Sequence, residues 1–193
     1  MIKPFVKWAG GKTNVISQIV NYLPIELIKG EIKKYAEPFI GGGAMLLHIL
    51  QNYNVETAYI SDINSKLITT YLSIKNNPYE LIEKLNEIEK NYIQKSVIQK
   101  EEYFYELRNT FNDSNIPDID IASHFIALNK TCFNGLFRVN SKGIFNVGWG
   151  KHDHPKISDP ENILNISKLL QKVEIVVDDY TKCFDFLDYN TFI

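Results

Sequence analysis

The first part of the chain alternates short extended segments with apolar helical segments, and this alternation restricts the fold more than any other feature. Residues 34–40 read as extended and run into three glycines at 41–43, after which residues 44–50 are apolar at helical spacing. Residues 58–61 then give a second strand and residues 66–74 a second helix. Parallel strands are joined by crossover helices of this kind, so the order predicts an α/β protein with a parallel sheet.

Helices and one further strand are predicted outside this unit. Residues 13–23 place apolar side chains on one helical face before Pro24 ends the pattern. Residues 78–112 are rich in Glu, Lys and Leu, which is typical of amphipathic helices, and residues 118–128 form another apolar helix. Four of the five residues at 173–177 are valine or isoleucine, which indicates a strand.

Two turn signals lie between these segments. Residues 136–147 predict a β-hairpin, with Gly143 at the position of the turn that favours a left-handed residue. Ser158 is the expected N-terminal cap of a helix, with Glu161 three residues later.

Composition and charge limit the partners that the chain can have. The net charge is −2 over 193 residues, so a nucleic acid must be met by a local basic patch. No apolar run approaches the ~18 residues of a membrane helix, and no signal-peptide core follows the N-terminus. Cys132 and Cys183 lack metal-ligand spacing and are expected to be buried. These features predict a cytoplasmic protein with no membrane or metal partner.

Two glycine-rich segments resemble nucleotide-binding motifs without matching them. The segment Gly10-Gly11-Lys12-Thr13 has the end of a phosphate-binding P-loop, but Val6 stands where that motif needs glycine. The glycines at 41–43 fit the start of a dinucleotide fingerprint and fail at its third glycine. Asp62 follows Gly41 by 21 residues at the end of the next strand, where a carboxylate can bind the ribose hydroxyls of an adenosine cofactor.

Four blocks of the sequence, taken in order, resemble the Dam-type DNA adenine-N6 methyltransferases. They are Phe-Val-Lys-Trp-Ala-Gly-Gly-Lys at 5–12, Glu-Pro-Phe-Ile-Gly-Gly-Gly at 37–43, Ser-Asp-Ile-Asn at 61–64, and the segment 129–147 that begins Asn-Lys-Thr-Cys-Phe-Asn-Gly. The resemblance implies a Rossmann-like methyltransferase sheet, here incomplete, at residues 1–75 and 157–193. It also implies an inserted DNA-recognition domain of helices and a hairpin at residues 76–156.

The resemblance further implies a site for S-adenosyl-L-methionine. It assigns cofactor binding to Trp8, Lys12, Glu37, Phe39, Gly41, Gly43, Asp62 and Asp179. Within this set, Trp8 and Lys12 would lie near the methionine part and Asp62 at the ribose. Asp179, with Tyr180 beside it, would lie near the cofactor adenine, and Asp178 remains the alternative.

Double-stranded DNA is the partner that the resemblance implies. It places Arg138 at a guanine, Phe133 beside a flipped base and Asn134 at a phosphate. The segment 129–156 carries five basic residues and one acidic residue, a net charge of +4, which supplies the local basic patch. Where GATC-reading members have proline after Phe-Asn-Val, this chain has Gly148-Trp149-Gly150, which argues against assigning GATC as the recognition sequence.

The catalytic signature of the resembling family, Asp-Pro-Pro-Tyr, does not occur, because no two of the seven prolines are adjacent. Residues 188–193 are expected to open the strand that would carry it. We therefore expect these 193 residues to be catalytically inactive alone, with a missing C-terminal segment supplied in cis or in trans. Two other hypotheses stay open: a split or degenerate remnant that binds cofactor or DNA without turnover, and an NAD-dependent α/β protein.

Overall fold

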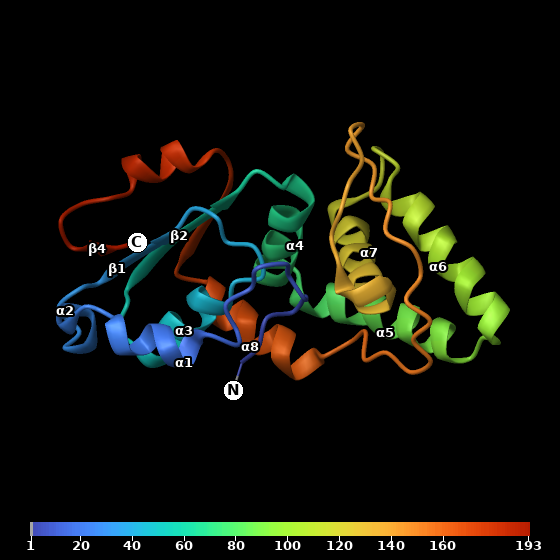
Figure 1. Ribbon diagram of the computed structural model, residues 1–193, viewed down its shortest axis with the longest axis horizontal. Coiled ribbons are helices and arrows are strands. Elements are labelled where there is room, and N and C mark those ends of the chain that lie inside the picture. The colour runs from blue at the N-terminus through green and yellow to red at the C-terminus, as the bar shows by residue number, and fades with distance from the viewer. Residues whose placement is uncertain (1) are drawn as a thin grey trace.

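A four-stranded parallel sheet forms one end of the molecule in the computed structural model, which describes residues 2–193 (Figure 1). The strands lie in the order β3-β2-β1-β4. Their bounds are β1 Lys34–Glu37, β2 Thr57–Asp62, β3 Val173–Val177 and β4 Thr191–Phe192. All three pairings are parallel, which confirms the predicted α/β class and the strand predicted at residues 173–177.

Alternating side chains give the sheet two apolar faces. Tyr35, Ala58 and Ile60 join the main hydrophobic core, whereas Ala36 and Tyr59 point to the opposite face. Helices α3 (Ala44–Asn52) and α8 (Pro160–Leu170) lie along the first face, and the 3-10 segment η3 (Tyr180–Asp185) lies over the second (Figure 1). Helix α4 (Ser65–Asn76) contacts β2, β3 and α8 at the end of the sheet.

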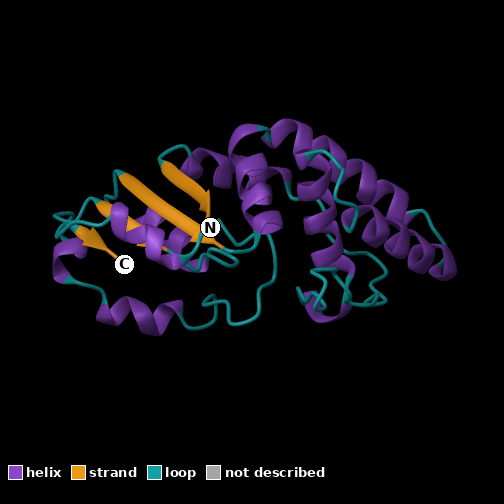
Figure 2. Cartoon of the chain, turned by 90° about the horizontal axis from the view of Figure 1, so that it is seen from above, coloured by secondary structure: helices purple, strands orange, loops and turns teal. Residues whose placement is uncertain are grey.

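The other end of the molecule is helical (Figure 2). It contains α5 (Pro78–Ile93), α6 (Val97–Phe111) and α7 (Asp118–Thr131), followed by the 3-10 turn η2 (Phe133–Gly135). Ser96 and Gln99 form a capping box at the start of α6. Helix α7 packs against α4 as well as against α5 and α6, so it joins the helical end to the sheet end.

The helix predicted at residues 13–23 is wrong in its extent. The structure has α1 (Ile16–Ile19), the 3-10 turn η1 (Val20–Tyr22) and, after Pro24, α2 (Ile25–Ile28). Neither α1 nor η1 buries a residue, although the spacing predicted one apolar face against the core. Ile19 and Val20 pack against the main core but stay partly exposed.

The predicted helix cap at Ser158 is also wrong. Asp159 precedes α8 as the N-cap residue, without a side-chain hydrogen bond, and Pro160 opens the helix. The backbone N–H of Ser158 donates instead to the Glu89 carboxylate at 2.8 Å. Glu89 of α5 thus accepts the N–H that Glu161 would accept in a capping box.

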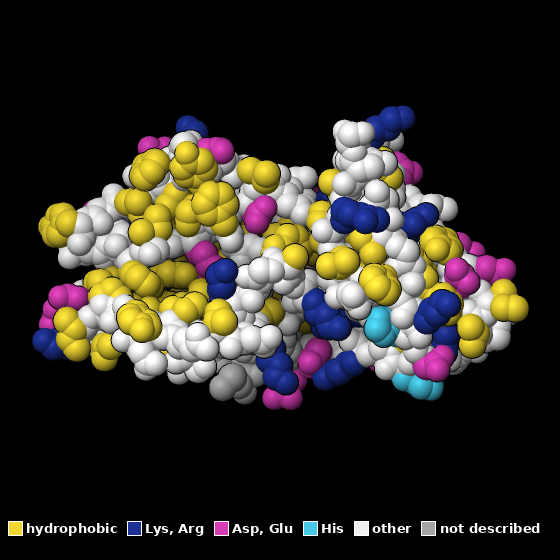
Figure 3. Space-filling view, in the orientation of Figure 1, with side chains coloured by type: hydrophobic (Ala, Val, Ile, Leu, Met, Phe, Trp, Pro, Cys, Tyr) yellow, Lys and Arg dark blue, Asp and Glu magenta, His cyan; other side chains and the backbone are white. Residues whose placement is uncertain are grey.

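The last residues form a strand, as expected. In β4, Thr191 pairs with Lys34 and Phe192 with Tyr35, so only the first half of β1 has a neighbour on that side. Hydrophobic side chains gather in a hollow at this end, between η3 above and the α1–α2 region below (Figure 3). The segments around it carry exposed large hydrophobic residues at Tyr22, Ile25, Ile28, Phe184, Tyr189 and Ile193.

Candidate cofactor pocket and nucleic-acid interface

The turn between β1 and α3 is built from three glycines that lie in close contact with other side chains. Gly41 and Gly43 have positive φ angles of +48° and +70°, which residues with a side chain rarely adopt. A Cβ on Gly41 would lie 2.6 Å from Cδ1 of Trp8, and one on Gly43 would collide with the Tyr71 hydroxyl. The backbone therefore approaches both aromatic residues as closely as glycine allows.

A cavity of about 260 Å³ lies between this turn and the N-terminal loop. Six of the eight residues predicted to bind the cofactor line it: Trp8, Lys12, Glu37, Phe39, Gly41 and Gly43. These residues come from two blocks of sequence more than 20 positions apart, and the fold brings them to the carboxyl end of β1. This is the edge at which ligands bind in open parallel sheets.

Asp62 and Asp179 do not line the cavity; Asp62 contacts a residue that does, and Asp179 is connected to the cavity through Tyr180. Asp62 ends β2 and accepts the Gly41 N–H at 3.2 Å and the Asn64 N–H at 3.0 Å. Asp179 accepts the Thr181 N–H at 3.0 Å and begins η3. Tyr180, beside Asp179, stacks on Phe39 with ring centroids 5.6 Å apart, and this contact connects the end of β3 to the cavity wall.

Glu37 is the perturbed acid of the cavity. Burial raises the pKa of its carboxyl group from 4.5 to about 7, while hydrogen bonds from the Tyr35 hydroxyl and the Leu46 backbone N–H act in the opposite direction. The Tyr35 hydroxyl donates to Oε2 of Glu37 at 2.9 Å. A cationic group placed in the cavity would favour the ionised carboxylate and lower this pKa again.

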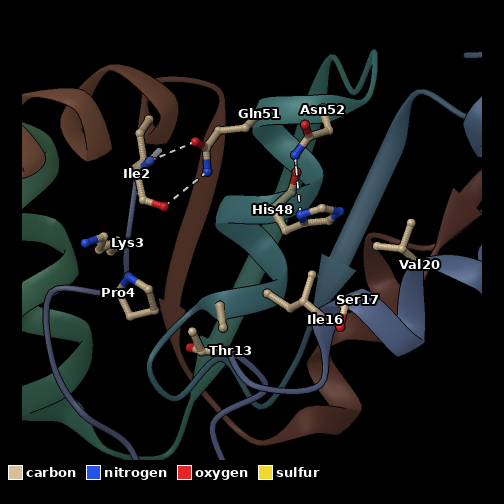
Figure 4. Close-up of a pocket in the computed structure, with 11 residues that line it drawn as sticks. Ile2, Lys3, Pro4, Thr13, Ile16, Ser17, Val20, His48, Gln51 and Asn52 are labelled. Atoms are coloured by element: carbon tan, nitrogen blue, oxygen red, sulfur yellow. Dashed lines mark hydrogen bonds between the residues drawn. The ribbon is translucent and has the colours of Figure 1, made fainter.

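A larger cavity of about 730 Å³ lies between α3, α1 and residues 2–4 (Figure 4). Ile16 and Val20 line one wall and His48 the other, and the Gln51 side chain closes one end by binding the backbone N–H of Ile2 at 2.9 Å. None of the residues predicted to bind cofactor or DNA lines this cavity. Its walls are mostly apolar. Although it is larger, we therefore do not take it as the candidate binding site.

The residues predicted to bind DNA lie on the segment that follows α7. The Phe133 side chain is 57% exposed, and Asn134 has a positive φ of +54° inside η2. Arg138 is exposed on the hairpin, where its Nε donates to Oδ1 of Asn146 at 2.9 Å. The hairpin prediction is confirmed by the antiparallel bridge between Val139 and Phe145, and Gly143 has the expected positive φ of +75°.

The segment that departs from the GATC-type pattern lies directly beside Phe133. The Phe133 N–H donates to the Gly148 carbonyl at 2.9 Å, and the Gly150 N–H donates to Thr131 at 2.8 Å. The Trp149 indole N–H donates to the Tyr92 hydroxyl at 2.7 Å and fixes this segment to α5. The Gly148-Trp149-Gly150 segment thus supports a residue that is predicted to contact DNA.

Basic side chains are spread over this end of the molecule (Figure 3). Among the five predicted to form the patch, Arg138, Lys142 and Lys151 are exposed, whereas Lys130 is partly buried and Lys156 pairs with Asp159 at 2.9 Å. The acid of the segment, Asp153, pairs with Lys100 at 3.5 Å. In residues 2–193, no helix is long and apolar enough to cross a membrane, and no cluster of three His, Cys, Asp or Glu side chains could hold a metal.

A buried asparagine joins the two candidate sites. Asn129 accepts the Lys7 N–H at 2.8 Å and donates to the carbonyl groups of Lys7 and Gly135, each at 2.9 Å. Lys7 precedes Trp8 of the cavity, and Gly135 follows Asn134. Asn129 had no predicted role, although it is the first residue of the segment 129–147 that resembles the methyltransferases. The cavity residues Gly10, Gly11 and Met45 were also not predicted.

The chain is similar to known proteins over nearly its whole length. Residues 8–193 match the model of the D12 class of N6 adenine-specific DNA methyltransferases. The chain is 44% identical over its whole length to the type II methyltransferase M.MjaIII of Methanocaldococcus jannaschii, covering 67% of that protein. It is 34% identical to the type II methyltransferase M1.LlaDCHI of Lactococcus lactis subsp. cremoris, over 94% of this chain and 60% of the relative.

A third relative is the DNA adenine methylase of Haemophilus influenzae, which is 31% identical over 99% of this chain and 62% of its own length. The chain therefore spans 60 to 67% of these three relatives. The matched region includes the cavity, the Asp62 strand end and the hairpin, because it runs from Trp8 to the last residue. The chain belongs to the D12 class of N6 adenine-specific DNA methyltransferases.

Proposed function

We propose that these residues form the cofactor-binding and DNA-binding part of a site-specific methyltransferase that acts on N6 of adenine in duplex DNA. The D12 family uses S-adenosyl-L-methionine, which supplies the electrophilic methyl group when it is bound. The observation that carries the proposal is the single cavity lined by six of the eight predicted cofactor residues. Asp62, held against the same glycine turn, supports it.

The residues of the cavity fit this cofactor in their chemistry. The carboxylate of Asp62 can accept hydrogen bonds from ribose hydroxyls, because its two backbone donors leave further lone pairs free. Phe39 is 71% exposed and stacked on Tyr180, so it offers an apolar shelf. Glu37 can pair with a cationic group of the ligand, and such a group would favour the ionised carboxylate that burial disfavours.

The hairpin and η2 are proposed to bind the DNA. The Arg138 guanidinium keeps donors free beyond its Nε bond to Asn146, and such a fork can bind guanine O6 and N7 together. Phe133 is exposed beside a turn, where an aromatic ring can stack against a base that leaves the duplex. Arg138, Lys142 and Lys151 give this segment a positive charge that attracts phosphates.

Methyl transfer needs groups that hold the adenine amine against the methyl donor. Since Asp-Pro-Pro-Tyr does not occur in these 193 residues, we propose that they bind both ligands without detectable turnover. The hydrophobic hollow beside β4 supports a further segment, in cis or in trans, that packs there and brings the catalytic groups (Figure 3). The second candidate function, a degenerate binding remnant, has the same two ligands and no such segment.

Calorimetric titration with S-adenosylhomocysteine tests the cofactor proposal. We expect saturable binding of S-adenosylhomocysteine to the purified chain and no binding of NAD. Asp62→Ala should weaken the binding of S-adenosylhomocysteine about tenfold or more, because it removes two charge-assisted hydrogen bonds. Binding of NAD in place of S-adenosylhomocysteine would overturn the proposal.

Transfer of labelled methyl groups to adenine-containing duplex DNA tests the catalytic part. We expect no transfer by these 193 residues alone. We expect transfer after addition of the part of the M. jannaschii relative that this chain does not cover, since the two chains are 44% identical over the shared region. Methylation of adenine by the chain alone would contradict the proposed lack of turnover. Binding without rescue would favour the degenerate remnant.

A further inference from the structure

Both backbone polar groups of Gly41 are bound by one structural unit, which is β2 with the helix that follows it. The Gly41 N–H donates to Asp62 Oδ2 at 3.2 Å, and its carbonyl oxygen accepts the Tyr71 hydroxyl at 3.0 Å. Asp62 is the last residue of β2, and Tyr71 lies in the second turn of α4. Asn64 fixes the start of α4, because its side chain accepts the Leu67 N–H at 3.1 Å and its own N–H donates to Asp62.

Tyr71 is fully enclosed, although a hydroxyl group usually reaches water. Its side chain is 1% exposed, and its ring packs edge-on against Phe5 with centroids 4.9 Å apart. A Cβ on Gly43 would collide with the hydroxyl oxygen, so the phenol also fills the space that the turn leaves open. Burial raises the pKa of Tyr71 well above its ordinary value, with Glu37 and Asp62 adding to the effect, which keeps the hydroxyl a hydrogen-bond donor.

The Gly41 carbonyl depends on this hydroxyl. Within residues 2–193, no other donor reaches that oxygen. Gly43, two residues later, is the N-cap residue of α3 and makes no side-chain cap. The turn has one hydrogen bond of its own, from the Gly43 N–H to the Ile40 carbonyl at 2.9 Å, whereas the Gly41 carbonyl is bound from outside the turn by Tyr71. A buried carbonyl without a partner is costly.

We propose that Tyr71 is a positioning residue for cofactor binding: its hydroxyl holds the Gly41–Gly43 turn in the shape that the cofactor contacts. This inference rests on the proposed function for the identity of the ligand. Tyr71 itself does not line the cavity, and it acts through the backbone of Gly41. The Asp62 carboxylate and the Tyr71 hydroxyl thus set the position of one peptide unit from two sides.

The test compares Tyr71→Phe with Tyr92→Phe. Each change removes one buried hydroxyl and keeps the ring. The Tyr92 hydroxyl donates to the His152 carbonyl at 2.8 Å and accepts from Trp149, and Tyr92 does not line the cavity. Binding of S-adenosylhomocysteine is measured by calorimetry, and binding of a DNA duplex by fluorescence anisotropy.

We expect Tyr71→Phe to weaken S-adenosylhomocysteine binding about tenfold and to leave DNA binding within about twofold, because the lost hydrogen bond is local to the turn. Tyr92→Phe should leave the cofactor affinity unchanged. Equal cofactor affinity for Tyr71→Phe and the unaltered chain would overturn the inference, as would a parallel loss of both ligands.

Hydrogen exchange of the unliganded protein provides a second readout that needs no ligand. The amides of residues 39–46 should exchange faster in Tyr71→Phe than in the unaltered chain and should not change in Tyr92→Phe. Unchanged exchange at these amides would overturn the inference. If the unaltered chain does not bind S-adenosylhomocysteine, the proposed function fails, while the exchange experiment still decides whether Tyr71 positions the turn.

Discussion

Gly43 in the Gly41–Gly43 turn and Gly143 in the hairpin have nearly the same backbone conformation, with φ of +70° and +75°, but very different surroundings. A Cβ on Gly43 would collide with the Tyr71 hydroxyl, whereas nothing lies within 4 Å of a Cβ on Gly143. Each turn is closed by its own hydrogen bond of 2.9 Å, from the Gly43 N–H to the Ile40 carbonyl and from the Gly143 N–H to the Asn140 carbonyl. The difference teaches that buried neighbours constrain the Gly41–Gly43 turn in addition to its own chain, while the hairpin turn is shaped by its own chain.

Substitution of the two glycines by alanine is the strongest test of this difference. We expect Gly43→Ala to lower the free energy of unfolding by about 3 kcal/mol or more, because backbone strain and overpacking add. Gly143→Ala should cost only about 1 kcal/mol, which is the strain alone. Chemical denaturation of both variants measures the two values, and equal losses would show that the Tyr71 contact does not constrain the turn.

The DNA side of the comparison depends on an exposed side chain. We expect Arg138→Ala to weaken binding of the cognate duplex about 10- to 100-fold, because one bidentate base contact is worth ~1–3 kcal/mol. The free energy of unfolding should change by less than about 0.5 kcal/mol, since the side chain is exposed.

Two further variants of the hairpin serve as controls. Arg138→Lys should not restore the affinity, because lysine lacks the planar fork. Lys142→Ala removes an exposed charge of the same hairpin, so its effect should be weaker and should vanish at high salt. Equal losses for Arg138→Ala and Lys142→Ala at every salt concentration would contradict a base contact by Arg138.

The pH dependence of the free energy of unfolding tests the surroundings of Glu37, which lines the same cavity as the Gly41–Gly43 turn. Its carboxyl pKa is raised from 4.5 to about 7 in the folded protein, so the native state holds the proton more tightly than the unfolded chain. Glu37 therefore stabilises the fold at low pH, and this contribution is lost as pH rises from about 4.5 to about 7. We expect a loss of about 1–2 kcal/mol, reduced because the side chain is partly exposed to solvent.

Glu37→Gln removes the titration of this carboxyl group and leaves the other acids unchanged. The difference in the free energy of unfolding between the two proteins therefore reports on Glu37. The free energy of unfolding of the unaltered chain, minus that of the variant, should fall by about 1–2 kcal/mol between pH 5 and pH 8. Urea denaturation at each pH measures it. A difference that rises with pH would mean that the hydrogen bonds from Tyr35 and Leu46 outweigh burial.

The Gly41–Gly43 turn was predictable from sequence because the spacing of a few nearby residues indicates it. Three consecutive glycines after a short strand, and an acid 21 residues after Gly41, suffice to place the turn and Asp62 at one sheet edge. Tyr71 and Asn129 were not predictable in their roles, because each acts through a contact made across the fold, 30 and 122 residues away along the chain. A buried tyrosine on an apolar helix carries no local signal that separates packing from positioning.

Contacts across the fold also account for the two wrong predictions, the helix at residues 13–23 and the cap at Ser158. Residues 13–23 have helical spacing, yet α1 and η1 bury no side chain completely, because Ile19 and Val20 pack against the core only in part. Ser158 stood at a cap position, but its backbone N–H is taken by Glu89 from α5. Local patterns predict elements well where tertiary contacts agree with them, and they fail where a distant side chain supplies the hydrogen bond.

The smallest expected effect concerns Asn146, which is the only side chain in the described residues that binds the Arg138 guanidinium. Both side chains are exposed, so the bond contributes little to stability, and its role is to limit the directions in which the guanidinium points. We expect Asn146→Ala to weaken binding of the cognate duplex about threefold, in line with ~0.5–1 kcal/mol for one exposed hydrogen bond. In the Arg138→Ala background the same change should have no further effect, because the partner is gone. Equal losses in both backgrounds would show that Asn146 contacts DNA independently, and the hairpin would then bind through separate side chains.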